Sequence, residues 1–146
     1  MQIEVLRLKS LARELVETWS SAWDSKDTQS ASRFYSKDPA QVFFDLGPIH
    51  FGWDQYKKSV EQSFATIDSL KLSLAEDMKV VIRGSIGLTI STGHISYKMK
   101  DGTLYDSDVR FSGVWENDAG DWRLIHEHWS HIVRQTPDVR RLEQTF

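Results

Sequence analysis

Residues 104–132 read LYDSDVRFSGVWENDAGDWRLIHEHWSHI and predict two long strands joined by a tight turn. Apolar and polar residues alternate over 104–116 and again over 122–132, which is the period of a strand with one buried face. Between these segments, Asn117-Asp118-Ala119-Gly120 is a hairpin signal. The C-terminal half of the chain therefore predicts an antiparallel meander of long strands.

The same period of two extends upstream of this hairpin. Leucines alternate with polar residues over 70–74, and further strand-like segments cover 78–82 and 86–99. Asp101-Gly102 predicts a second turn, which leads into the strand at 104–116. Glycines inside these segments predict bulges or bends that let long strands curl.

Helical periodicity replaces this alternation in the first half of the chain. Apolar residues recur every three or four positions over 3–23 and again over 53–67, so both segments predict amphipathic helices. A shorter helix is predicted between Asp27, a suitable N-cap, and Pro39. A short strand is predicted at 41–45, before the turn residues Gly47-Pro48.

This order of elements, helices first and strands after, predicts one α+β domain. The N-terminal helices are expected to pack on one face of a curved antiparallel sheet and to close it into a cone around a small-molecule pocket. A chain of 146 residues with 40% apolar content can bury a real core, and we place the domain at residues 1–132. Residues 133–146 are predicted to form a polar tail.

The composition excludes several classes of protein. A net charge of −3 that is spread along the chain gives no electrostatic footprint for nucleic acid. The absence of cysteine excludes disulfides, thiolate nucleophiles and thiolate metal sites. The first residues interleave charged and apolar side chains, unlike a signal peptide, and no stretch approaches the roughly 20 apolar residues of a membrane span. We therefore expect a cytoplasmic protein with no membrane partner.

Several strings resemble the nuclear transport factor 2-like superfamily, and within it the SnoaL-like group that includes ketosteroid isomerase relatives. The most telling strings are FYSKD at 34–38, VFFD at 42–45, FGWD at 51–54 and GDWRLIHEHWS at 120–130. The resemblance covers about residues 8–132 and implies the cone-shaped fold of that superfamily. It implies no single reaction, because members share a scaffold and differ in chemistry.

Compared with ketosteroid isomerase, the resemblance implies half of a proton-transfer site. Asp45 stands at a place similar to that of the isomerase's carboxylate base, at the end of the first strand. The isomerase also uses a Tyr and a protonated Asp as hydrogen-bond donors to the enolate oxygen, and those positions are held here by Trp19 and Phe111. Indole offers one weak donor and phenyl none, so we do not expect steroid isomerisation by that mechanism.

Asp45 and Glu127 are the candidate catalytic carboxylates. Asp45 leaves the predicted core just before a Gly-Pro turn, and an Asp that only caps this turn is the alternative. The isomerase comparison places Glu127 inside the cone together with Ile125, where an aromatic cavity raises a carboxyl pKa and suits acid/base work. The alternative is a Glu127 that pairs with Arg123 or Arg110 near the sheet surface.

Aromatic residues are predicted to line the pocket, although a place in the core is the first interpretation of each. The candidate ligand-binding residues are Trp19, Trp23, Tyr35, Phe43, Tyr56, Tyr97, Phe111 and Trp129. His126 and His128 project from one strand face and could reach one metal ion, with a third ligand from Asp106, Asp108 or His94. Histidines that hydrogen-bond across the sheet or line a dimer interface are favoured over a metal site. We therefore expect no metal and no cofactor.

Two classes of function follow, and the sequence does not decide whether the protein is an enzyme. The first is a SnoaL-like protein that binds a small apolar molecule, as a cofactor-free isomerase, cyclase or hydrolase with Asp45 as base and Glu127 as a second acid/base group. The second is a non-catalytic ligand-binding or oligomerisation module, similar to kinase II association domains in its Trp, His-x-His and Ser pattern. A homodimer through the outer face of the sheet is expected on either view.

Overall fold

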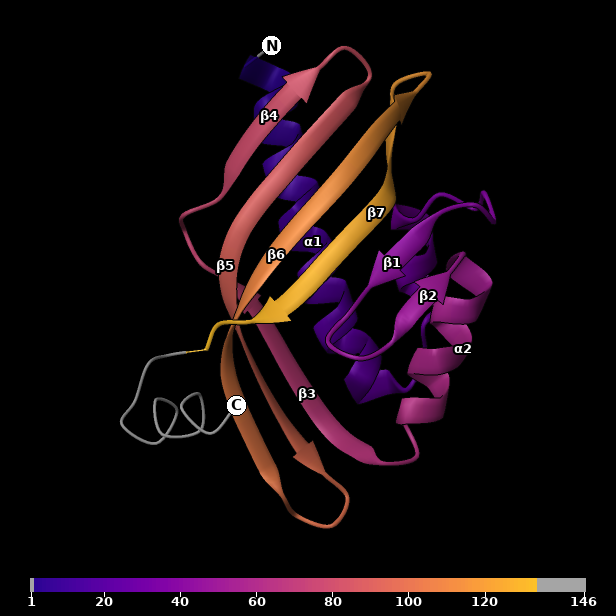
Figure 1. Cartoon of the computed structure of the whole chain (residues 1–146), viewed down its shortest axis with the longest axis vertical. Helices are drawn as coiled ribbons and strands as arrows, with labels where there is room; N and C mark the ends of the chain where they lie inside the picture. The colour runs from indigo at the N-terminus through magenta and orange to yellow at the C-terminus, as the bar shows by residue number, and fades with distance from the viewer. Residues whose placement is uncertain (1, 134–146) are drawn as a thin grey trace, which may run out of the picture.

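The computed structural model describes residues 2–133, which form two α-helices, one 3-10 helix and seven strands (Figure 1). In chain order these are α1 (Gln2–Ser25), η1 (Gln29–Phe34), β1 (Val42–Phe44), β2 (Ile49–Phe51), α2 (Trp53–Ser63), β3 (Ile67–Leu74), β4 (Lys79–Arg83), β5 (Ile86–Met99), β6 (Leu104–Asp118) and β7 (Asp121–His131). Across residues 2–133, neither α-helix is long and apolar enough to cross a membrane. From residue 134 onward, the predicted tail lies outside the described residues.

The seven strands form one curved sheet in the order β2-β1-β7-β6-β5-β3, with β4 paired to β5 (Figure 1). The sheet does not close on itself, and the helices cover its inner face. The predicted α+β class and curved antiparallel sheet are confirmed, with one exception. β1 pairs with β7 in parallel, because the chain reaches β1 from η1 and first runs alongside β7 at the bridge between Tyr35 and Leu124.

The long helix α1 packs across the inner face of the sheet, as its apolar periodicity predicts (Figure 1). Leu8, Leu15 and Trp19 lie on its buried stripe. Gly87 in β5 lets the helix approach the sheet closely, since a Cβ atom there would lie 2.4 Å from Cδ1 of Leu8. The indole N–H of Trp122 donates to Glu4 at 2.7 Å and ties β7 to the first turn of the helix.

Two helical predictions differ from the structure in detail. The short helix expected after Asp27 is the 3-10 helix η1, and the helix expected over 53–67 ends at Ser63. Phe64 still packs edge-on against Trp23, with ring centroids 4.9 Å apart, and Ile67 begins β3. Apolar residues that continue a helical period therefore pack on the core after the helix itself has ended.

A β-bulge in β7 changes which residues face the helices. The pairing of β6 with β7 shifts so that Val114 is opposite His126 while Trp115 is opposite Leu124. Ile125 is the extra residue and is only half-buried, whereas Leu124 and Glu127 are both fully buried. Strict alternation places Ile125 inside the cone with Glu127, and that prediction is wrong because the bulge resets the alternation.

Candidate functional site

A cavity of about 280 Å³ lies between α1, α2 and the inner face of the sheet. Its wall comes from these helices, from the turn between β1 and β2, and from β3, β5 and β7. The lining residues are Trp19, Trp23, Asp45, Leu46, Gly47, Pro48, Tyr56, Ser59, Val60, Ser63, Ile67, Leu70, Leu72, Ile95, Tyr97 and Trp129. Among these described lining residues, Asp45 is the one carboxylate and there is no Lys, Arg or His. The cavity is therefore aromatic and apolar, with a single acidic group.

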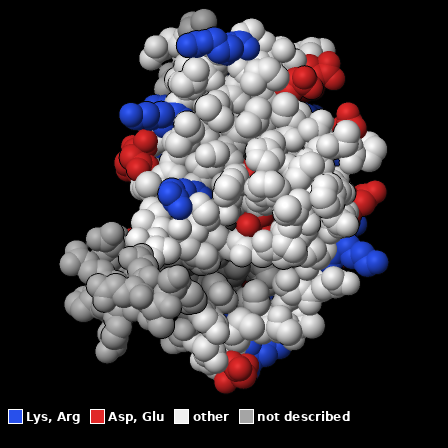
Figure 2. All heavy atoms as spheres, in the orientation of Figure 1, with Lys and Arg blue, Asp and Glu red and all other residues white. Residues whose placement is uncertain are grey.

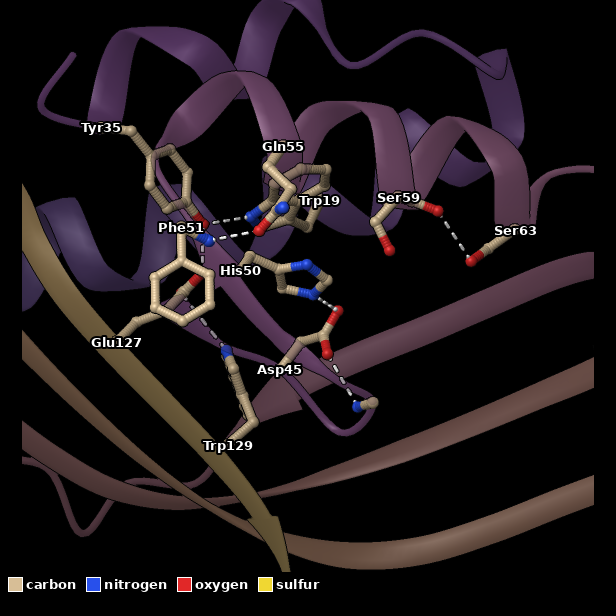
Figure 3. Close-up of polar contacts among 11 residues, drawn as sticks. Trp19, Tyr35, Asp45, His50, Phe51, Gln55, Ser59, Ser63, Glu127 and Trp129 are labelled. Carbon is tan, nitrogen blue, oxygen red and sulfur yellow. Dashed lines mark hydrogen bonds and ion pairs between the residues drawn. The ribbon is translucent and has the colours of Figure 1, made fainter. Parts of the chain in front are cut away.

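Asp45 lies at the cavity because it directly follows β1, where the chain turns towards β2. One carboxylate oxygen, Oδ1, accepts the backbone N–H of Gly47 at 2.7 Å. The other, Oδ2, lies 3.1 Å from Nε2 of His50, and the side chain is 29% exposed (Figure 3). Asp45 therefore does both things that the sequence suggested as alternatives: it caps the turn, and it also lines the cavity.

His50 is the site residue that sequence reasoning missed. It is the central residue of β2 and is 1% exposed, while its neighbours Ile49 and Phe51 are exposed. Its ring stacks on Tyr56, with centroids 4.7 Å apart and an interplanar angle of 3°. The alternation in Ile49-His50-Phe51 was the available signal, because it leaves a histidine alone on the buried face of the strand.

Glu127 lies behind the cavity wall and is fully buried. Its Oε1 accepts the hydroxyl of Tyr35 at 2.7 Å, and its Oε2 accepts the indole N–H of Trp129 at 3.3 Å (Figure 3). Trp19 in turn donates to the Tyr35 hydroxyl at 2.7 Å. Both of these partners of Glu127 are thus aromatic side chains, one directly after η1 and one in β7, and the suggested surface pairing with an arginine is wrong.

Burial raises the pKa of Glu127 from 4.5 to about 7, although hydrogen bonds from Tyr35, Tyr56 and Trp129 act to lower it. Burial also raises the pKa of Tyr35 well above its usual value, and the charge on Glu127 adds to this effect. The environment expected for Glu127 is therefore present, but Glu127 is not among the residues that line the cavity. Its role as a second acid/base group stays a prediction.

The predicted aromatic residues divide into two layers. The first layer lines the cavity and consists of Trp19, Trp23, Tyr56, Tyr97 and Trp129. The second layer, Tyr35, Phe43 and Phe111, is fully buried behind the first. Phe111 packs on Trp129 with centroids 4.6 Å apart, and Tyr35 contacts Trp19 edge-on at 6.1 Å. The second layer fixes the rings that face the cavity.

The histidines of β7 lie away from the cavity. His126 and His128 flank Phe44, with ring centroids 5.2 and 5.5 Å from it, and Nδ1 of His126 is 2.6 Å from the carbonyl oxygen of Val42. His94 lies on β5 between two aspartates of β6. Within residues 2–133, no group of three His, Asp or Glu side chains is arranged to hold a metal ion.

Comparison with known proteins identifies the family. Residues 12–134 match the family model described as the SnoaL-like domain. The chain belongs to the SnoaL-like domain family. No curated protein matches the sequence. The resemblance stated from the four sequence strings is thus confirmed.

Solved structures share the fold of this SnoaL-like domain. An NTF2-like superfamily protein from Salmonella enterica subsp. enterica serovar Typhimurium str. LT2 is 18% identical with a TM-score of 0.75, over 90% of this chain and 95% of that one. A protein provisionally named a dehydratase, from the NTF2-like family of Streptomyces avermitilis, is 18% identical with a TM-score of 0.71, over 91% and 99%. The CaMKII hub of S. rosetta is 20% identical with a TM-score of 0.66, over 88% and 96%. At these identities the likeness shows the fold alone.

Proposed function

We propose that this SnoaL-like domain binds a small, uncharged, largely apolar molecule in the cavity, and that Asp45 acts on it as a general base without a cofactor. The observation that carries this is a single carboxylate at the wall of an aromatic cavity. With no cationic side chain among the described lining residues, nothing there would neutralise an anionic ligand beside Asp45. A volume of about 280 Å³ is at the lower end for ligand pockets and favours a molecule of one or two rings.

The chemistry that suits this cavity is proton transfer. A carboxylate held by a backbone N–H is oriented before a ligand arrives, and the apolar wall strengthens its interactions with the ligand. Proton removal at one atom and return at another would give an isomerisation. Ser59 lines the cavity, and its hydroxyl donates no hydrogen bond within the described residues, so it is available to a polar group of the ligand.

The donors of the ketosteroid isomerase mechanism have no counterpart at the predicted positions. The indole N–H of Trp19 is already donated to Tyr35, and Phe111 lies behind Trp129. Glu127 acts in our proposal as a positioning residue, because its hydrogen bond from Trp129 fixes an indole that lines the cavity. Asp45 is then the group that touches the ligand.

Ligand binding can be tested with a matched pair of probes, 2-naphthol and 2-naphthoate, by isothermal titration calorimetry. We expect the neutral 2-naphthol to bind and the anionic 2-naphthoate to bind at least about tenfold more weakly, as uncompensated repulsion by Asp45 requires. The variant Ser59→Trp fills the cavity and should abolish binding. Its neighbour Lys58 is exposed, so Lys58→Trp is the matched control and should bind 2-naphthol like the wild type. Equal binding by both tryptophan variants would contradict the proposed site.

The base can be tested with 5-nitrobenzisoxazole, an uncharged bicyclic probe. A base that removes the proton on C3 breaks the N–O bond, and the ring opens to a coloured cyanophenolate. We expect turnover by the wild type and its loss in Asp45→Asn, because the amide cannot accept the proton. Wild-type turnover in Asp45→Asn would refute Asp45 as the base.

A second copy of the chain is the partner that we propose for the outer face of the sheet. Figure 1 shows α1 behind the strands, and Figure 2 shows few charged side chains over the face that the strands turn to the viewer. Val81, Ile86 and Ile90 are exposed on neighbouring strands of this face, and Ile90 is 43% exposed. Lys79 and Arg83 pair with Ile90 and Ile86 on this face, so the isoleucines form an exposed apolar patch with few charges around it, and such a patch on an open sheet favours an isologous dimer.

Light scattering after size exclusion tests this assembly, and we expect twice the mass of one chain. Ile90→Arg places a charge inside the apolar patch and should give monomers. Ile3 is 77% exposed on α1, so Ile3→Arg adds the same charge elsewhere and should remain dimeric. A monomeric wild type would overturn the assembly without affecting the proposed ligand site.

A further inference from the structure

One nitrogen beside the cavity is not explained by packing. His50 is 1% exposed, and its Nε2 is buried with no hydrogen-bond partner among the described residues. This atom points towards Asp45 and lies 3.1 Å from Oδ2, within ion-pair distance but without hydrogen-bond alignment (Figure 3). A buried polar atom that makes no hydrogen bond costs about 1–3 kcal/mol. A phenylalanine could stack on Tyr56 without that cost, so stacking alone does not account for the imidazole.

The short distance requires a proton on one of the two atoms. Two lone pairs facing each other at 3.1 Å would repel, so either Nε2 or Oδ2 carries a hydrogen. Since Oδ1 already accepts the N–H of Gly47, a proton on Nε2 would hold the second carboxylate oxygen as well. Hydrogen bonds of a catalytic pair are often poorly aligned before the ligand binds and tighten in the complex.

We infer that His50 is a positioning residue: its Nε2 carries a proton and holds the carboxylate of Asp45 on the side away from the cavity. This inference rests on the proposed function. His50 is not among the residues that line the cavity, so it does not touch the ligand. In the serine protease triad a carboxylate orients an imidazole that faces the substrate, and here the order is reversed. Asp45 takes a proton from the ligand and later returns it, while His50 keeps its own proton throughout.

Long-range nitrogen–proton NMR spectra of the imidazoles test the pair without any turnover. The His50 signals are assigned by their loss in His50→Gln. We expect a ring that carries a proton on Nε2 in the wild type, and a shifted Nε2 signal in Asp45→Asn. The signals of His128, which is exposed on β7, should not move and serve as the reference. A wild-type ring protonated on Nδ1 alone would overturn the inference.

Turnover of 5-nitrobenzisoxazole tests what the pair does. His50→Phe keeps a ring to stack on Tyr56 but has no N–H, so we expect kcat to fall by about tenfold or more with little change in KM. His50→Gln retains an N–H donor and should recover part of that loss, and His128→Phe is the control for an exposed histidine. Unchanged kcat in His50→Phe, with turnover lost in Asp45→Asn, overturns the role of His50 and leaves the proposed function standing. Wild-type kcat in Asp45→Asn overturns both.

Discussion

The two carboxylates of the cone sit in opposite surroundings. Asp45 is 29% exposed at the cavity, accepts a backbone N–H and lies 3.1 Å from the imidazole of His50. Glu127 is fully buried and is held by Tyr35 and Trp129. Glu127 has the raised pKa that often marks a functional acid, yet Asp45 is the carboxylate at the cavity wall. Access to a ligand therefore separates the two groups more sharply than the pKa does.

The largest difference between Asp45 and Glu127 should appear in how much each contributes to the free energy of unfolding. Glu127→Ala leaves the Tyr35 hydroxyl and the Trp129 indole without their acceptor and creates a cavity, so we expect a loss of about 4 kcal/mol in the free energy of unfolding. Asp45→Ala should cost only about 1 kcal/mol, because its partners are close to the open cavity. Urea denaturation of both variants measures this. Equal losses of unfolding free energy in the two variants would mean that the buried hydrogen bonds of Glu127 stabilise the fold no more than those of Asp45.

The pH dependence of stability should also come from Glu127. The folded-state pKa of about 7 exceeds the ordinary value of 4.5, so the folded protein binds the extra proton and stability falls as pH rises between these values. The full shift corresponds to about 3 kcal/mol, present below pH 4.5 and lost above about 7. Urea midpoints at pH 5 and pH 8 should differ in the wild type, and less in Glu127→Gln. The same pH difference in both proteins would assign it to other groups.

A smaller effect is expected from the donor that holds Glu127. Tyr35→Phe removes the hydroxyl that donates to Oε1, so we expect a loss of about 1–2 kcal/mol. Because this hydrogen bond lowers the pKa of Glu127, its removal should raise that pKa further. The pH at which stability levels off should therefore move upward in denaturation curves measured across pH. A downward movement would mean that Tyr35 acts on Glu127 in another way.

The contrast between the carboxylates also shows how far sequence reasoning reaches. Periodicity predicted α1 and the long strands, because each buries one continuous face. It placed Asp45 at a turn beside the predicted pocket, since a strand and a Gly-Pro turn are local features. Periodicity misplaced Ile125, because the bulge in β7 arises from pairing with β6 and is not visible in the local sequence pattern.

The site itself was predicted less completely than the fold. The pairing of Asp45 with His50 depends on how β1 and β2 pair and on the Asp side chain folding back at the turn, which spacing alone does not give. Whether an aromatic residue lines the cavity or lies behind it depends on layers of packing. Tyr35 and Tyr56 are both buried, yet of the two only Tyr56 lines the cavity.

The smallest effect on stability should come from the isosteric change Asp45→Asn. Its amide oxygen can still accept the N–H of Gly47, so we expect less than about 1 kcal/mol of destabilisation. The same variant should lose turnover of 5-nitrobenzisoxazole, because an amide is no base at this position. Glu127→Gln is the matched change at the buried carboxylate and should retain turnover. If instead Glu127→Gln lost turnover while Asp45→Asn kept it, the two carboxylates would exchange roles, and access to the cavity would not be what selects the catalytic group.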